Sequence, residues 1–369
     1  MSMSLKSVAN RVDQLEPSGI RKVFEIANQH PEYINLSIGE PDFDLPDELK
    51  EEGCRAILAG HNRYTPTKGI PELRRLIAEQ LDRRAIQYGD FIVTAGATGG
   101  LLLCMLALAD RGDQILVPDP YFVAYRNICY LAGAEPVTVD TYPDFMLKAD
   151  QVEPLITLRT KALILNNPNN PTGRVYDPEE LQKIAALADR HGFYLISDEV
   201  YEPFVYNEKF VSLGQLSPHA LVVNSFSKSA AMTGWRLGYT SGPCSVIEKM
   251  ITLQQFTHAS LNSVAQQMAL KAFAIDWSPY RLAYKKKRDL IVEKLSPYFQ
   301  LAKPEGGFYL FPQAPSGDGL SFFAKAQAAG VLIVPGKDFS QRDTHFRISF
   351  AVDDDTLLEG AKRLSAIAG

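Results

Sequence analysis

Between about residues 90 and 240 the chain alternates short apolar runs with longer amphipathic segments, and this alternation restricts the fold more than any other feature. The apolar runs lie in FIVTAG, ILVPDP, ALILNNP, FYLISDEV and LVVNSFSK, and each stops at Gly, Pro, Asn or Asp. Runs of four to six apolar residues that end in this way predict buried parallel strands. The amphipathic segments predict crossover helices, so we expect an α/β sheet with helices on both faces.

The length of 369 residues suits two domains. One crossover helix is expected to begin at the Asp177-Pro178-Glu179-Glu180 cap and to end at His191-Gly192. A long charged helix around residues 280–295 precedes GGFYLF, VLIVPG and HFRISF, a mixture that predicts a smaller α+β domain. We therefore predict an N-terminal segment at 1–45 that joins the small domain, a large domain at 46–280 and a small C-terminal domain at 281–369.

Charge and cysteine usage exclude several classes of function. The formal net charge of −5 provides no positive field for a nucleic-acid backbone. The four cysteines are far apart, without a CxxC pair or a metal-ligand spacing, so we expect reduced thiols and no metal site. The longest apolar run, residues 101–109, is much shorter than the roughly 20 residues that cross a bilayer. We expect a soluble, cytoplasmic protein with no nucleic-acid or membrane partner.

Polar and aromatic side chains follow the predicted strands, where open α/β sheets bind their ligands. These positions are Gly96–Gly100, Pro120–Phe122, Asn169–Gly173, Asp198–Tyr201 and Ser225–Lys228, and Arg236 lies eight positions after Lys228. Each has a purely structural interpretation: Asp198 as a helix cap, Tyr201 and Phe122 as core, Lys228 as a solvated loop residue. Those interpretations do not explain why all of them occur at one edge of one sheet.

Pyridoxal phosphate (PLP) accounts for the whole set. Its aldehyde needs an amine, its pyridine nitrogen needs a carboxylate, and its ring needs a flat partner. Its phosphate needs arginine, hydroxyls and the N-terminus of a helix.

Eight segments resemble the class I/II, fold-type I aminotransferases, which include aspartate, aromatic and kynurenine enzymes. In family order they are LSIGEPDF (36–43), RYTPTKGIPELR (63–74), TAGATGG (94–100), NNPNNPTG (166–173), SDEVY (197–201), SFSKSAAMTGWRLGY (225–239), GGFYLF (306–311) and FRISF (346–350). The SxSK…GWRxGY block is the most specific. The resemblance implies a fold-type I PLP-dependent transferase with a large, mostly parallel-sheet domain and a smaller α+β domain.

The resemblance also implies the groups around the cofactor ring. Lys228 would form the Schiff base and later move the proton, and Asp198 would pair with the pyridinium nitrogen. Asn170 and Tyr201 would bond the phenolic oxygen, and Phe122 would stack on the ring in preference to Tyr121. The residues implied for catalysis are Lys228, Asp198 and Tyr201.

At the two ends of the pocket the resemblance implies phosphate and substrate contacts. The phosphate residues are Ala97, Thr98, Ser225 and Arg236, with Ser227 close by. Tyr64 would reach the phosphate of the neighbouring subunit, which makes the active unit a homodimer. Gly39, Asn170 and Arg347 would bind the substrate, with the guanidinium of Arg347 on the α-carboxylate.

The alternation in HFRISF places Arg347 on a polar face with His345 and Ser349. The alternative to a carboxylate clamp is therefore a surface salt bridge.

The implied activity is a ping-pong exchange of an amino group between an L-amino acid and a 2-oxo acid, 2-oxoglutarate or pyruvate. A PLP-dependent carbon–sulfur β-lyase is an alternative that uses the same lysine. A non-catalytic regulator domain is a second alternative, disfavoured because no basic or helix-turn-helix segment is fused to the chain. The preferred side chain stays open, because no second cation stands out, although Tyr64, Tyr121 and Phe308 near the expected pocket are compatible with bulky substrates.

Overall fold

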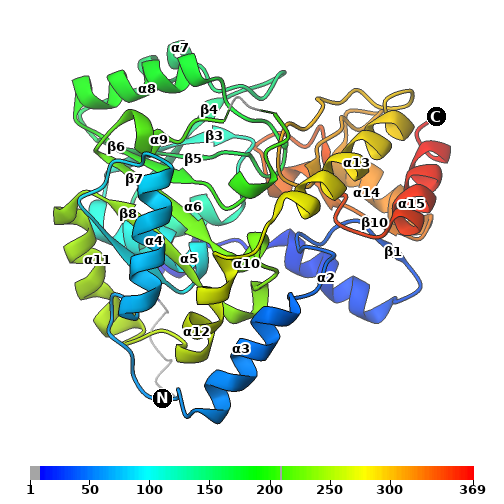
Figure 1. Ribbon diagram of the computed structural model, residues 1–369. Helices are drawn as coiled ribbons and strands as arrows, with labels where there is room; N and C mark the ends of the chain where they lie inside the picture. Colours follow the sequence, from blue (N-terminus) through cyan, green and yellow to red (C-terminus); the bar gives the residue numbers. More distant parts are fainter. Residues whose placement is uncertain (1–8, 208–209) are drawn as a thin grey trace, which may run out of the picture.

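The computed structural model describes residues 9–207 and 210–369, so residues 1–8 of the predicted N-terminal segment lie outside it. The centre of the molecule is a seven-stranded sheet in the order β2-β8-β7-β6-β5-β3-β4 (Figure 1). Its strands are β2 (Asp90–Thr94), β3 (Gln114–Asp119), β4 (Glu135–Asp140), β5 (Thr160–Asn166), β6 (Tyr194–Asp198), β7 (Ala220–Ser225) and β8 (Gly238–Gly242). Only β8 runs antiparallel to its neighbours, so the predicted mostly parallel sheet is confirmed.

The apolar runs predicted five of these strands but neither β4 nor β8. The outer strand β4 is largely half-buried or exposed, so its sequence EPVTVD lacks a continuous apolar run. The buried strand β8 reads GYTSG, in which small residues take the place of large apolar ones. A Cβ atom on Gly238 would lie 2.5 Å from the carbonyl oxygen of Asn224 and 3.0 Å from the backbone of Gly96. Close backbone packing therefore explains why β8 has no apolar signal.

Helices cover both faces of the sheet, as predicted. One face packs on α5 (Gly96–Leu108), α6 (Ala124–Ala132) and α11 (Cys244–Thr257), and the other packs on α4 (Pro71–Arg83), α8 (Pro178–His191) and α12 (Ser263–Ala272). Neighbouring strand residues point to opposite cores, as Ile196 and Leu195 do. The predicted ends of α8 are confirmed, because Asp177 accepts a cap bond from the Glu179 N–H and Gly192 adopts φ 73° after the last turn.

A second, smaller group of elements follows residue 278 (Figure 1). Its antiparallel sheet has the order β11-β12-β9, from β9 (Tyr309–Leu310), β11 (Val334–Pro335) and β12 (Phe346–Ser349). Three helices accompany it: α13 (Ser278–Leu295), α14 (Gly319–Ala328) and α15 (Asp354–Ala366). Strand β1 (Ile34–Asn35) pairs in parallel with β10 (Val331–Leu332), which ties the N-terminal segment to the C-terminal elements. The division of the chain at residues 45 and 280 stays a prediction.

The remaining helices are α1 (Asn10–Asp13), α2 (Gly19–Gln29), α3 (Asp47–Leu58), α7 (Ala149–Val152), α9 (Leu213–Leu216) and α10 (Phe226–Ser229). In the described part of the chain, no helix combines the length and the apolarity needed to span a membrane.

Candidate active site

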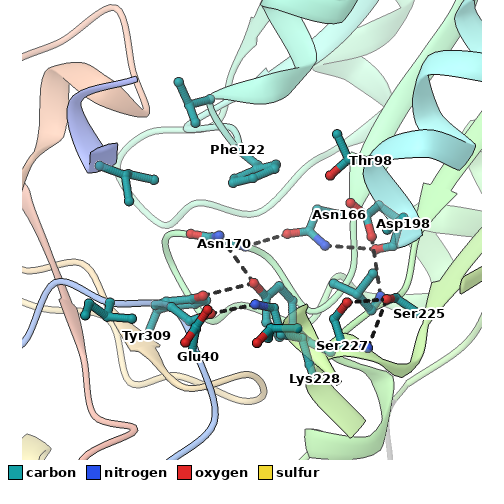
Figure 2. A pocket seen from close by; sticks show the side chains of 18 of the residues that line it. Glu40, Thr98, Phe122, Asn166, Asn170, Asp198, Ser225, Ser227, Lys228 and Tyr309 are labelled. Atoms are coloured by element: carbon teal, nitrogen blue, oxygen red, sulfur yellow. Dashed lines mark hydrogen bonds between the residues drawn. The ribbon is translucent and has the colours of Figure 1, made fainter. Parts of the chain in front are cut away.

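A pocket of about 460 Å³ lies where the parallel strands end, and its size is in the range of small-molecule sites (Figure 2). The predicted site residues that line it are Gly39, Ala97, Thr98, Phe122, Asn170, Asp198, Tyr201, Ser225, Lys228, Arg236 and Arg347, together with Ser227. Tyr64 does not line it, and its side chain is 89% exposed on the surface. Tyr121 is buried outside the pocket, where its hydroxyl accepts a hydrogen bond from Arg126.

The order of the strands explains why these side chains meet. Strands β5, β6 and β7 are parallel neighbours that end at Asn166, Asp198 and Ser225, so the residues after them leave the sheet at the same edge. Ser225 then caps the short helix α10, because its hydroxyl accepts the N–H of Ser227 at 3.0 Å. This turn directs Lys228 into the pocket, where Figure 2 shows it below Phe122 and beside Glu40.

The surroundings of Lys228 suit a nucleophile. Its Nζ donates to the carbonyl oxygen of Gly39 at 2.6 Å. Burial lowers the pKa of Lys228 to about 8, although the nearby Glu40 carboxylate acts in the opposite direction. A lysine with a lowered pKa is partly neutral near physiological pH, and the neutral amine is the form that attacks an aldehyde.

Asp198 is a buried carboxylate that forms no ion pair within the part of the chain that the structure describes. Its side chain is 3% exposed, Oδ2 accepts from the Tyr125 hydroxyl at 2.8 Å, and Oδ1 accepts from the Val200 N–H at 3.4 Å. Burial raises the pKa of Asp198 to about 6. Within the described residues no lysine or arginine forms an ion pair with it. Since an unpaired buried charge is costly, the site suits a cation supplied by a ligand, such as a protonated pyridine ring.

The adjacent carboxylate, Glu199, shows the contrast. It is buried too, but Arg84 donates to it at 2.5 Å and the hydroxyls of Ser197 and Ser212 also bond to it. Glu199 is thus satisfied by the protein, whereas Asp198 is not.

Arg347 is the opposite case, a buried cation that forms no ion pair with a carboxylate of the described residues. It is 1% exposed, Nη1 donates to Asn170 Oδ1 at 3.0 Å and Nη2 donates to the Ser37 carbonyl oxygen at 2.6 Å. Its Nε has no partner among residues 9–207 and 210–369. The guanidinium carbon lies 4.5 Å and 4.7 Å from the ring centres of Tyr309 and Phe339. A carboxylate ligand would satisfy this cation.

The alternative of a surface salt bridge is wrong, because Arg347 is buried and forms no ion pair within the described residues. All four residues of β12 are buried, because the strand lies between β11 and β9 and is covered on both sides. His345 is partly buried and stacks on Phe311. Alternation in a short strand cannot distinguish a solvent-facing side from one that faces a pocket.

Asn170 links the substrate end of the pocket to two tyrosines. Its Nδ2 donates to the Tyr201 hydroxyl at 3.4 Å, and the hydroxyls of Tyr201 and Tyr309 lie 3.0 Å apart. Tyr309 lines the pocket, whereas the predicted Phe308 is fully buried in the core. The sequence GGFYLF does not indicate which of the two aromatic residues faces the ligand.

The other end of the pocket is suited to an anion. Helix α5 begins at Gly96, where φ is 69°, and a Cβ atom there would lie 3.0 Å from the guanidinium of Arg236. Glycine therefore allows Arg236 to approach the N-terminus of α5, whose free N–H groups attract a phosphate. The hydroxyls of Ser225 and Ser227, 2.8 Å apart, lie in the same part of the pocket wall (Figure 2).

Comparison with known proteins agrees with this geometry. Residues 31–364 match the family described as aminotransferase class I and II. The chain belongs to this family. The aspartate/prephenate aminotransferase of Thermus thermophilus is 36% identical over 99% of this chain and 100% of its own length. A probable aspartate/prephenate aminotransferase of Aquifex aeolicus is 39% identical over 97% of this chain and 98% of its own length. These relatives confirm the predicted family and activity.

Solved aminotransferase structures confirm the fold. The aspartate aminotransferase from Thermus thermophilus with maleate superposes with a TM-score of 0.93 at 35% identity, covering 98% of this chain and all of that one. An aspartate aminotransferase from Thermotoga maritima gives a TM-score of 0.92. The protein is therefore a PLP-dependent aminotransferase of fold type I.

Sequence reasoning missed three residues of this aminotransferase site: Tyr309 and Arg21, which line the pocket, and Tyr125, which lies behind its wall. Tyr125 and Arg21 lie on helices α6 and α2, where an aromatic residue suggests core and an arginine suggests a solvated face. Among the described residues we found no cluster of three or more metal-ligating side chains.

Proposed function

We propose that the pocket around Lys228 carries out amino transfer between an L-amino acid and a 2-oxo acid, with Lys228 as the Schiff-base lysine. The observation that supports this most is a pair of buried, oppositely charged side chains, Asp198 and Arg347, neither of which forms an ion pair within the described residues. When bound, PLP supplies the electron sink that stabilises negative charge at the substrate α-carbon. Arg347 binds the α-carboxylate, and Lys228 Nζ takes the proton from the α-carbon.

The other polar residues of the pocket hold the cofactor in place. Asp198 would keep the pyridine nitrogen protonated, and Asn170 and Tyr201 would bond the phenolic oxygen. Phe122 would exclude water from one face of the ring. The N–H groups of Ala97 and Thr98, the hydroxyl of Ser225 and the guanidinium of Arg236 would bind the phosphate. A Cβ atom on Gly39 would overlap the Tyr309 hydroxyl, so glycine lets this segment pack against Tyr309 at the substrate end of the pocket.

We propose that the active unit is a homodimer in which Tyr64 completes the partner's phosphate site. Support comes from the exposed segment that carries Tyr64, residues 61–67. It is held against residues 259–263 by hydrogen bonds, among them Thr67 Oγ1 to the Ala259 carbonyl at 3.1 Å. Large apolar side chains are exposed on the preceding helix α3, Ile57 and Leu58, and near the end of α11, Phe256. Exposed apolar groups of this size are typical of subunit interfaces.

A cytoplasmic location is part of the proposal. All four cysteines are free thiols in the structure, which suits a reducing compartment.

For the amino donor we propose a dicarboxylic amino acid. Several similar enzymes carry aspartate in their names, and the Thermus structure was solved with maleate, a dicarboxylate. In this chain Arg21 of α2 also lines the pocket, and no acidic side chain in the described ranges pairs with it. A second guanidinium in the pocket is the group needed for a distal carboxylate.

Half-reactions with a panel of donors test these proposals. Holoenzyme should lose its visible band at lower concentrations of aspartate or glutamate than of phenylalanine or alanine, and 2-oxoglutarate or pyruvate should restore it. A lyase would release ammonia and a 2-oxo acid from a β-substituted amino acid without any added acceptor. Turnover of that kind without amino transfer would refute the proposed function.

A further inference from the structure

We propose that Tyr125 is a positioning residue of this active site: its hydroxyl fixes Asp198 as an acceptor for the cofactor's ring nitrogen, and its ring supports Phe122. The proposal rests on the function proposed above. It concerns a side chain that lies behind the pocket wall and is not among the pocket-lining residues.

The geometry places Tyr125 between two groups that face the cofactor. Tyr125 is 2% exposed and its hydroxyl donates to Asp198 Oδ2 at 2.8 Å. Its ring meets that of Phe122 edge-on, with centroids 5.7 Å apart and planes at 80°. The backbone N–H of Tyr125 donates to the Phe122 carbonyl at 3.0 Å, in the first turn of α6. One side chain thus contacts both the carboxylate at the ring edge and the aromatic residue at the ring face.

The backbone of Asp198 is fixed independently of Tyr125. Asn166 Nδ2 donates to the Asp198 carbonyl oxygen at 2.9 Å, and β6 pairs with both β5 and β7 up to this residue. What remains to be fixed is the orientation of the carboxyl group. The Val200 N–H is a long contact at 3.4 Å, so the phenol is the stronger of the two donors.

A neutral donor suits this position better than a cation. Arg84 neutralises the neighbouring Glu199, and an arginine at residue 125 would do the same to Asp198 and compete with the protonated ring. A phenol orients the carboxylate and leaves its charge in place. It also makes the carboxylate less basic, since a hydrogen bond to the ionised form stabilises that form. The proton shared with the ring then stays on the ring nitrogen.

Removing the hydroxyl should therefore shift that proton toward Asp198. In Tyr125→Phe we expect kcat to fall about tenfold or more, the scale of one hydrogen bond to a charged group. KM for donor and acceptor should stay within about twofold, because Arg347 is unaffected. The pH midpoint of the holoenzyme's visible band should move upward. A less positive ring repels a proton on the lysine nitrogen less, so this nitrogen stays protonated to a higher pH.

Tyr176→Phe is the matched control. Tyr176 is also buried, does not line the pocket, and bonds Asn169 at 3.4 Å instead of Asp198. The control should leave the band midpoint and the ratio of kcat to KM unchanged. Thermal unfolding of both apoproteins measures the packing cost of each substitution separately. Equal midpoints in Tyr125→Phe and wild type would overturn the proposal, whatever the loss of stability.

A double-mutant cycle with Asp198→Ala completes the test, and we would measure it on the affinity of apoprotein for PLP. If Tyr125 acts through Asp198, Tyr125→Phe weakens PLP binding in the wild-type background and adds little in the Asp198→Ala background. Full additivity would assign Tyr125 to packing alone. Failure of the proposed function is distinguishable, because the wild-type holoenzyme would then show no amino transfer in the half-reactions, whereas the PLP-affinity cycle reads Tyr125 and Asp198 without any turnover.

Discussion

The Nζ of Lys228 donates a hydrogen bond of 2.6 Å to the carbonyl oxygen of Gly39, a residue 189 positions earlier in the chain. This contact joins the end of the central sheet to the N-terminal segment that pairs with β10. It holds the amine in the pocket through a neutral acceptor, and no carboxylate of the described residues forms an ion pair with it. Burial lowers its pKa to about 8, against the opposing effect of the nearby Glu40 carboxylate.

The lowered pKa predicts how apoprotein takes up PLP. The uptake rate should rise with pH to a midpoint near 8, because the neutral amine reacts and an ordinary lysine becomes neutral only near 10.5. Stopped-flow absorbance would measure it. The Lys228→Ala variant should keep its fold. After borohydride reduction, mass spectrometry should find no cofactor covalently bound to it. Cofactor fixed to the Lys228→Ala protein would show that another lysine is the nucleophile.

The same shift predicts a pH-dependent stability of the apoprotein. The folded-state pKa of Lys228 lies below its unfolded value, so the folded state binds fewer protons between about pH 8 and 10.5. This lysine therefore costs stability below pH 8, and the cost disappears as the pH rises through that window. Lys228→Met should be more stable than wild type at pH 7, with the difference shrinking toward pH 10.5. A constant difference in denaturant midpoints across this range would contradict the assignment.

Asp198→Ala should lose far more turnover than stability. Loss of a preorganised electrostatic partner costs several kcal/mol of barrier, on the order of 10²-fold or more in kcat. Asp318→Ala is the control for a simple helix cap, since Asp318 accepts the Ser321 N–H at 2.9 Å. It should cost about 1 kcal/mol of stability and leave kcat unchanged. If Asp198→Ala instead loses stability and keeps its kcat, as this control should, Asp198 is only a helix cap.

Mixed dimers test the proposed role of Tyr64. If Tyr64 serves the partner's phosphate, exchange between Tyr64→Ala and Lys228→Ala homodimers places both lesions in one site and leaves the other intact. Activity should then recover toward half of the wild-type value per heterodimer. Sedimentation measures the assembly in parallel, and a fully active monomer would rule out the shared site.

Arg347→Lys separates substrate binding from cofactor binding. The charge is kept but the bidentate fork is lost, so KM for the amino acid and for the 2-oxo acid should both rise about tenfold, the scale of 1.5–3 kcal/mol for a bond to a charged group. The visible spectrum should not change. A weaker hold on PLP with unchanged KM values would mean that Arg347 does not bind the α-carboxylate.

Arg21→Gln tests the proposed distal carboxylate contact. KM for aspartate should rise about tenfold, whereas KM for phenylalanine should stay near the wild-type value. Lys22→Gln is the control, because Lys22 is the next residue of α2 and does not line the pocket. Equal effects of Arg21→Gln on both donors would remove Arg21 from side-chain selection.

The α/β sheet, the cofactor class and most of the residues of the pocket wall were predictable from the sequence. Strands buried on both faces need uninterrupted apolar runs, so five of the seven were visible, and their ends had to gather because parallel strands finish at one edge. Asp198, Lys228 and Asn170 follow such runs directly. The ends of helix α8 were also predictable from the sequence, because the cap at Asp177 and the turn at Gly192 are local features.

Which residues support or complete that wall depends on contacts between distant segments. Tyr125 reaches Asp198 across 73 positions, and Arg347 meets Asn170 across 177. Neither contact has a local pattern, because periodicity predicts which side chains are buried but not which residues they contact. The same limit explains why a surface salt bridge stayed open for Arg347, why Phe308 was named in place of Tyr309, and why Arg21 was missed. Burial is encoded residue by residue, whereas partners are selected by the packing of segments far apart in the chain.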